Sequence, residues 1–99
     1  MPKATVRLPH QGDQEAVLEK VMPAIEKTVA DFQGHGLSMN RSVNGADFSF
    51  KSMAFSLTGR MEVTASEVVV EVDLPFAAMM FKDKAERAIA KNLKRAIEA

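Results

Sequence analysis

Residues 57–74, LTGRMEVTASEVVVEVDL, alternate between apolar and polar side chains in two runs that a short segment separates. Successive side chains of a strand point to opposite faces of the sheet, so a period of two predicts two strands, each apolar on one face only. The segment TASE, residues 64–67, is typical of a turn. These residues therefore indicate an antiparallel pair with one buried and one solvated face.

The same alternation extends toward the N-terminus. It covers residues 37–43 and 46–51, and the dipeptide Asn44-Gly45 between them predicts a type I′ hairpin turn, in which both central residues have positive φ. Residues 3–8, KATVRL, alternate as well, and Pro9 ends that strand because it has no N–H for the ladder. We therefore expect one N-terminal strand and a later meander of four antiparallel strands.

Two segments have the period of an amphipathic helix. Residues 12–36 carry apolar side chains at spacings of three and four, with Asp13 as N-cap and Gly34 at the C′ position. Pro23 lies inside this pattern and predicts a kink. The second helix, from Phe81 to the C-terminus, has an apolar stripe made of Phe81, Ala85, Ala88, Ile89, Leu93, Ala96 and Ile97.

The predicted order is β-α-β-β-β-β-α in a single domain, residues 1–99. Because each strand is apolar on one face only, the two helices have a single face to cover. We predict an α+β fold: a two-layer sandwich with an antiparallel sheet of about five strands, both helices on one face and a polar opposite face. The order of the strands in the sheet does not follow from the sequence.

Composition limits the classes of function. Lys and Arg number 13 and Asp and Glu also 13, so the net charge is zero, which argues against a nucleic-acid binder and leaves a homodimer compatible with the composition. Cysteine is absent, which excludes disulfides and thiol catalysis and fits a cytoplasmic location. The first ten residues resemble no secretory signal, and no apolar run reaches the roughly 18 residues of a transmembrane segment.

No pattern of residues indicates catalysis or a cofactor. His10 and His35 stand at predicted element ends without metal-ligand spacing, and we interpret both as solvated loop residues. We therefore expect no catalytic, cofactor-binding or metal-binding residues, and no enzymatic activity. Mixed charges on the outward strand positions predict cross-strand ion pairs. Gly59 predicts close approach of a helix to the sheet, or alternatively a ligand cavity.

The segment PFAAMMFKDKAERAI, residues 75–89, changes from uncharged to charged in its middle. Phe81 is in phase with the helical stripe, which places it in the core. Phe76, Met79 and Met80 are either ordinary residues of a helix entry or a small exposed patch that contacts a partner surface or a second subunit. Together with the basic residues that follow, they form the candidate interaction surface: Phe76, Met79, Met80, Lys82, Lys84, Arg87, Lys91, Lys94 and Arg95.

Four segments carry a resemblance to a known family: VNGADFSF (43–50), LTGRMEV (57–63), VVVEVDLPF (68–76) and FKDKAERAIAKNLKRAI (81–97). With them the chain resembles the polyhydroxyalkanoic acid system proteins, also described as granule-region proteins, over nearly its whole length. Phe50, Gly59, Phe81 and Lys82 match the family pattern, whereas Val43 stands where tryptophan is common and Asp83 where glycine is common. The resemblance implies a cytoplasmic accessory protein of storage-polyester metabolism and transfers no catalytic residue.

Two hypotheses follow. The first is a non-enzymatic accessory or interaction protein of polyhydroxyalkanoate metabolism that associates with the granule surface or with granule proteins. The alternative is a small-molecule or acyl-chain binding module, with the ligand between sheet and helices near Gly59 and the seven methionines. Nucleic-acid binding through the basic final helix is disfavoured by the zero net charge.

Overall fold

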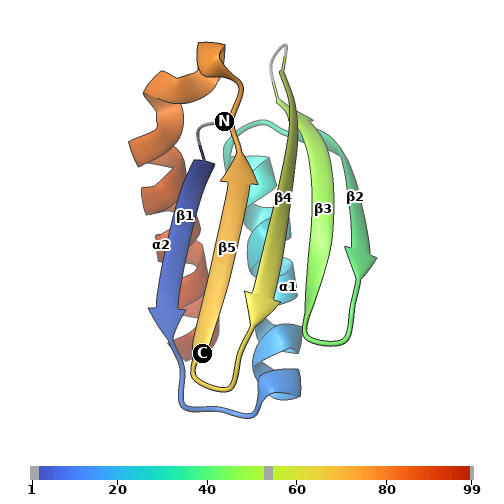
Figure 1. Cartoon of the computed structure of the whole chain (residues 1–99), viewed down its shortest axis with the longest axis vertical. Helices are drawn as coiled ribbons and strands as arrows, with labels where there is room; N and C mark the ends of the chain where they lie inside the picture. The colour runs from blue at the N-terminus through green and yellow to red at the C-terminus, as the bar shows by residue number, and fades with distance from the viewer. Residues whose placement is uncertain (1–2, 53–54, 99) are drawn as a thin grey trace.

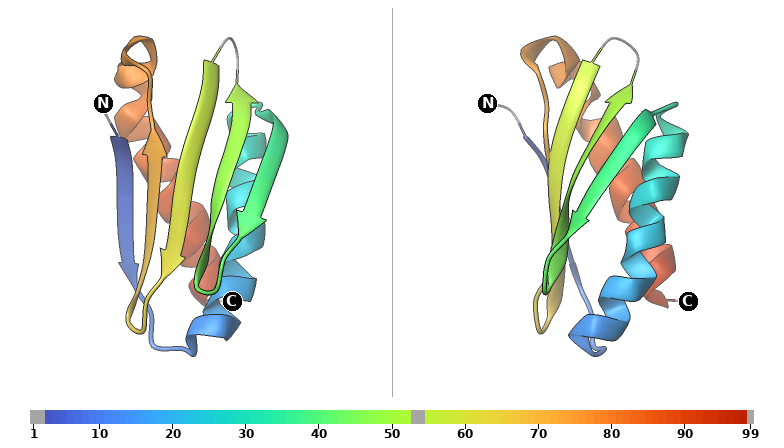
Figure 2. Two further views of the ribbon diagram at one scale, coloured as in Figure 1. Left: turned by 45° about the vertical axis from the view of Figure 1, so that its right-hand side comes forward. Right: turned by 90° about the vertical axis from the view of Figure 1, so that its right-hand side faces the viewer.

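The computed structural model describes residues 3–52 and 55–98, which form a five-stranded sheet and a layer of two helices (Figures 1 and 2). The elements are β1 (Lys3–Pro9), α1 (Gln14–Asp31), β2 (His35–Arg41), β3 (Gly45–Ser52), β4 (Phe55–Val63), β5 (Glu67–Asp73), the 3-10 helix η1 (Phe76–Phe81) and α2 (Lys82–Glu98). Both helices lie on the same side of the sheet (Figure 2, right). The order β-α-β-β-β-β-α and the α+β fold are thus confirmed.

The strands lie in the order β1-β5-β4-β3-β2, and every neighbouring pair is antiparallel. The first two strands along the chain, β1 and β2, therefore run parallel to each other at opposite edges of the sheet. The connection between them is α1, which carries the chain from one edge to the other behind β3 and β4 (Figure 1). The second helix returns behind β1 and β5 and completes the layer.

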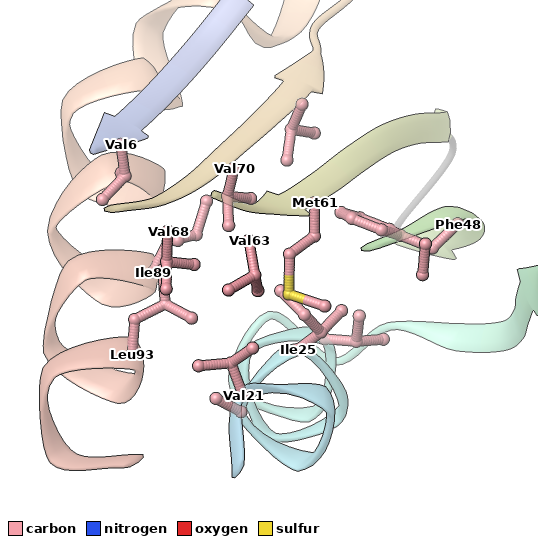
Figure 3. Close-up of a cluster of buried hydrophobic side chains, with 14 of the residues drawn as sticks. Val6, Val21, Ile25, Phe48, Met61, Val63, Val68, Val70, Ile89 and Leu93 are labelled. Atoms are coloured by element: carbon pink, nitrogen blue, oxygen red, sulfur yellow. The ribbon is translucent and has the colours of Figure 1, made fainter. Parts of the chain in front are cut away.

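The core fills the space between the sheet and the helices (Figure 3). Inward residues of the central strands, among them Met61 and Val70, face Val21 of α1 and Leu93 of α2, and these four side chains are all at most 1% exposed. Each fully buried aliphatic side chain of this kind contributes roughly 1.5–3 kcal/mol relative to exposure. The alternation in residues 57–74 therefore decides which face of the sheet receives the helices.

The outer face carries the predicted cross-strand ion pairs. They join Lys3 to Glu71 (3.4 Å), Arg7 to Glu67 (3.7 Å) and Arg60 to Asp47 (3.1 Å). All six side chains remain at least 40% exposed, so each pair contributes at most about 1 kcal/mol. This face is therefore a solvated surface, and the apolar side chains of the sheet are buried on the opposite face, under the helices.

The two edges of the sheet are blunted in different ways, β1 by a side chain of α2 and β2 by an irregular register. At the β1 edge, the carboxylate of Glu86 on α2 accepts a hydrogen bond from the backbone N–H of Thr5 (2.9 Å), and Lys82 pairs with the same carboxylate oxygen at 3.8 Å. At the β2 edge, the register with β3 shifts between His35 and Ser38, and Gly36 adopts a φ of +65°. Irregularities of this kind are common at sheet edges.

Two turn predictions are wrong in mechanism although they place the elements correctly. Among the described residues only Gln33 and Gly36 have positive φ, so Asn44-Gly45 is not a type I′ turn. Gly45 is instead the first residue of β3, where a Cβ atom would overlap the backbone carbonyl of Met61 on β4. At the end of α1 the left-handed residue is Gln33, with φ 57°, and not Gly34. The helix itself continues through Pro23.

The prediction for Gly59 was right about close approach and wrong about the partner. Gly59 pairs with Phe48 across β3 and β4, and a Cβ atom at Gly59 would overlap the Phe48 ring and lie 2.8 Å from the carbonyl oxygen of Glu71. The glycine thus makes room for a ring from the neighbouring strand and not for a helix.

Gly59→Ala is expected to lower the free energy of unfolding by about 1–3 kcal/mol, because the added methyl group overpacks the core against Phe48. Urea denaturation measures this change. Ser56→Ala, on the exposed outer side of the same strand, is the control and should change the value by less than about 0.5 kcal/mol. Combining Gly59→Ala with Phe48→Leu should recover part of the loss, since the two residues touch. Strictly additive losses would refute this account of Gly59.

Candidate functional site

An apolar patch is exposed where β5 passes into α2. Phe76 is 77% exposed, Met79 52% and Met80 81%, and we call these three residues of η1 the apolar knob. Ala78, on the opposite side of the same turn, is only 4% exposed. The structure thus shows that the side chains of Phe76, Met79 and Met80 are exposed.

The local sequence explains why the turn presents these side chains outward. Pro75 is extended and forms the N-cap, and its carbonyl accepts a hydrogen bond from Ala78 N–H at 2.9 Å. Side chains three residues apart eclipse each other in a 3-10 helix, which puts Phe76 and Met79 on one side. The small Ala78 side chain faces the molecule, on the same inner side as Phe81 three residues later.

A row of cations continues from the knob along α2. The basic stripe consists of Lys84, Arg87, Lys91, Lys94 and Arg95, all exposed and spaced so that they share one side of the helix. None of them forms an ion pair with another residue of the described ranges 3–52 and 55–98. Lys82 differs from this set, because it is half-buried and pairs with Glu86 at the β1 edge.

An apolar pocket of about 100 Å³ opens beside the knob, at the end of the sandwich where α1 ends and α2 begins. Ala78 and Phe81, from the inner side of η1, line it together with the inner faces of β3, β4 and β5. Five of the six phenylalanines of the chain contribute to its wall: Phe32, Phe48, Phe50, Phe55 and Phe81. Phe81 is only half-buried, so it borders this pocket and is not a fully buried core residue.

The pocket lies between sheet and helices, where the alternative hypothesis expects a ligand, but its lining differs from that expectation. No methionine of the described ranges contributes to the wall, and the Phe48 ring occupies the space over Gly59. The buried hydroxyls in the wall have partners within the protein: Thr28 Oγ1 donates to the Ala24 carbonyl (2.8 Å) and Ser52 Oγ to the Phe32 carbonyl (2.7 Å). The interior of the pocket is therefore effectively apolar.

A hydrogen-bonded group joins the two helices next to the pocket. Asn92 of α2 is buried, and its Nδ2 donates to Thr28 Oγ1 (2.8 Å) and to Asp31 Oδ2 (3.1 Å) on α1. The hydrogen bond from Asn92 lowers the pKa of Asp31 below its ordinary value of 3.8. Desolvation opposes this shift, whereas a hydrogen bond and charge from Lys27 and the charge of Lys91 add to it. In the sequence Asn92 only interrupts an apolar stripe, so its role as a contact was not predicted.

The interpretation of His10 as a solvated loop residue is wrong. His10 is 6% exposed, its Nδ1 accepts from Gly12 N–H (3.1 Å), and its Nε2 donates to the Thr64 carbonyl at 2.7 Å. It joins the end of β1 to the β4–β5 turn, and this contact explains its burial. His35 is exposed as expected. Among residues 3–52 and 55–98 no three His, Cys, Asp or Glu residues are grouped so that they could hold a metal ion.

A model of the polyhydroxyalkanoic acid system protein family matches residues 5–97, a range that includes the knob, the basic stripe and every element that lines the pocket. The chain belongs to this family. No curated protein matches the chain. The family description names a storage-polyester system and no molecular activity. Within the described part of this polyhydroxyalkanoic acid system protein, no helix is both long and apolar enough to span a membrane.

The Asn92 contact predicts a pH-dependent contribution to stability. Because the pKa of Asp31 is lowered in the folded protein, its carboxylate stabilises the fold above the unfolded-state pKa, and this contribution disappears as pH falls through the folded-state value. The difference in free energy of unfolding between the wild type and Asp31→Asn should therefore be constant above about pH 5 and shrink toward pH 2. Denaturation at a series of pH values measures it. A difference that stays constant down to pH 2 would contradict the assignment.

Proposed function

We propose that this chain is a non-enzymatic, cytoplasmic accessory protein of storage-polyester metabolism that docks on the polyester granule through the apolar knob and the basic stripe. The observation that carries the proposal is the exposure of Phe76, Met79 and Met80 on one short turn. Membership in the polyhydroxyalkanoic acid system family supports the choice of a polyester surface as the partner.

The knob has the properties of a contact made with a surface and not with a narrow pocket. Single exposed apolar residues are normal on proteins, but a cluster of large apolar side chains bordered by charged residues marks an interaction site. Burial of Phe76 and Met80 on an apolar polymer would contribute roughly 1.5–3 kcal/mol for each side chain. Met79 adds a flexible side chain that adapts to an irregular surface.

The basic stripe supplies a second, electrostatic component. Lys84 lies one helical turn after Met80, and Arg87, Lys91 and Arg95 extend the same side of α2 by three turns. These cations form no ion pair in the described ranges, and only Lys91 among them acts on a carboxylate, that of Asp31; the stripe can therefore attract carboxylate chain ends or other anions at a granule surface. Such attraction between exposed charges weakens as salt rises, since the Debye length falls from about 10 Å at 0.1 M to about 3 Å at 1 M.

Co-sedimentation with purified polyester granules tests the proposal. The double variant Phe76→Asp, Met80→Asp should lose about tenfold or more of its granule binding, because each substitution removes apolar area from the contact. Its free energy of unfolding should change by less than about 1 kcal/mol in total, since both side chains are exposed. Wild-type binding should also weaken as the salt concentration is raised from about 0.05 M to about 1 M.

The matched control is Val43→Asp. Val43 is 90% exposed and lies in the β2–β3 hairpin, at the end of the sheet opposite to η1 (Figure 1). The substitution Val43→Asp removes an exposed apolar side chain that is not part of the knob, so it should leave granule binding unchanged. Equal loss in both variants would refute docking through the knob. If the η1 variant instead changed the molecular mass in solution, the knob would be a contact between subunits.

A further inference from the structure

We infer that the apolar pocket binds a short, unbranched aliphatic carboxylate, with the hydrocarbon chain inside and the carboxylate at Lys84. This site is separate from the apolar knob: η1 presents Phe76, Met79 and Met80 to the outside, whereas its Ala78 and Phe81 border the pocket. The inference does not require docking on a granule, and either can hold without the other.

The size of the pocket limits the ligand. An apolar cavity of about 150 Å³ accommodates benzene, with six carbons. The pocket measures about 100 Å³, which by this comparison corresponds to about four carbons. It is open at its mouth, so a longer chain would leave its remainder in solvent and gain little.

The lining of the pocket favours a ligand whose inner end is apolar. The deep surface is formed by side chains such as Ile25, Phe50 and Val70, all of them buried. No buried side-chain nitrogen or oxygen of the described residues lacks a hydrogen-bond partner, and the hydroxyls of Thr28 and Ser52 donate to backbone carbonyls. A polar group carried deep into the pocket would therefore lose its hydrogen bonds to water without sufficient replacement.

The mouth of the pocket favours a ligand whose outer end is negatively charged. Lys84 is exposed and is the single charged side chain among the described residues that line the pocket. It belongs to the basic stripe and has no ion-pair partner within residues 3–52 and 55–98. A carboxylate placed at the mouth would meet this ammonium while it remains partly hydrated, and thus without the large cost of burying a charge.

Titration of the ¹⁵N-labelled protein with propanoate, pentanoate and octanoate, followed by amide chemical shifts, tests the inference. The affinity should rise about fifteenfold from propanoate to pentanoate, because each buried methylene contributes roughly fourfold, and it should rise much less per carbon to octanoate. Two further ligands isolate the polar groups. 5-Hydroxypentanoate should bind about tenfold more weakly than pentanoate, and 1-pentanol should bind with no dependence on Lys84.

Three variants locate the ligand. Ala85→Leu adds a larger side chain to the pocket wall and should abolish binding of pentanoate, with the circular dichroism spectrum as the check on folding. Lys84→Met should weaken pentanoate binding by about threefold, the effect of one exposed charge, without weakening 1-pentanol. Lys94→Met removes a cation of the same stripe that does not line the pocket, and it should have no effect.

Several outcomes would overturn the inference. Shifts confined to Phe76, Met79 and Met80 would show adsorption to the knob, and shifts that depend on protein concentration alone would show a second copy at the pocket. Unchanged binding in a folded Ala85→Leu would place the ligand elsewhere. Because Ala85 is not part of the knob, granule co-sedimentation of Ala85→Leu separates the two sites. If this variant sediments with granules but does not bind pentanoate, docking stands without the pocket. If the double variant Phe76→Asp, Met80→Asp binds pentanoate but does not sediment, the pocket stands without docking.

Discussion

Two helices must cover one face of five strands, and this geometric constraint determines the rest of the molecule. Five strands at about 4.8 Å spacing are roughly 19 Å wide, and two helices of about 10 Å diameter cover little more than that. The opposite face carries exposed ion pairs, among them Lys3–Glu71 and Arg60–Asp47. Because α1 also carries the chain between the two edges, it ends on the β2 side of the sheet, and the pocket lies at the end of the sandwich where α1 stops.

The sequence predicted the elements well because alternation in strands is a local property. Residues such as Val68, Val70 and Val72 show which face is buried without any knowledge of their neighbours. The strand order was not predictable, since the β1–β5 pairing joins residues that are 58 (Pro9 and Glu67) to 70 (Lys3 and Asp73) positions apart. A similar separation along the chain explains the error for His10, because its partner Thr64 lies 54 positions away in the sequence.

For the candidate site, the sequence identified the residues and not their arrangement. The uncharged run before α2 indicated Phe76, Met79 and Met80, and their exposure follows from the short turn that Pro75 begins. The pocket is assembled from α1, three strands, η1 and α2, so no contiguous pattern reports it. Asn92 is a sequence signal for the contact between the two helices. A polar residue in an apolar stripe points to a specific partner, and here the partners are Thr28 and Asp31.

The two edges of the sheet affect how copies of the protein behave when they are crowded. A sheet grows into a filament only if one regular edge can pair with another, again and again. In this fold Glu86 occupies a donor of β1, and the shift between His35 and Ser38 disturbs β2, so strand addition is hindered at both ends. Folded copies at high concentration are therefore disfavoured from joining edge to edge into a continuous sheet.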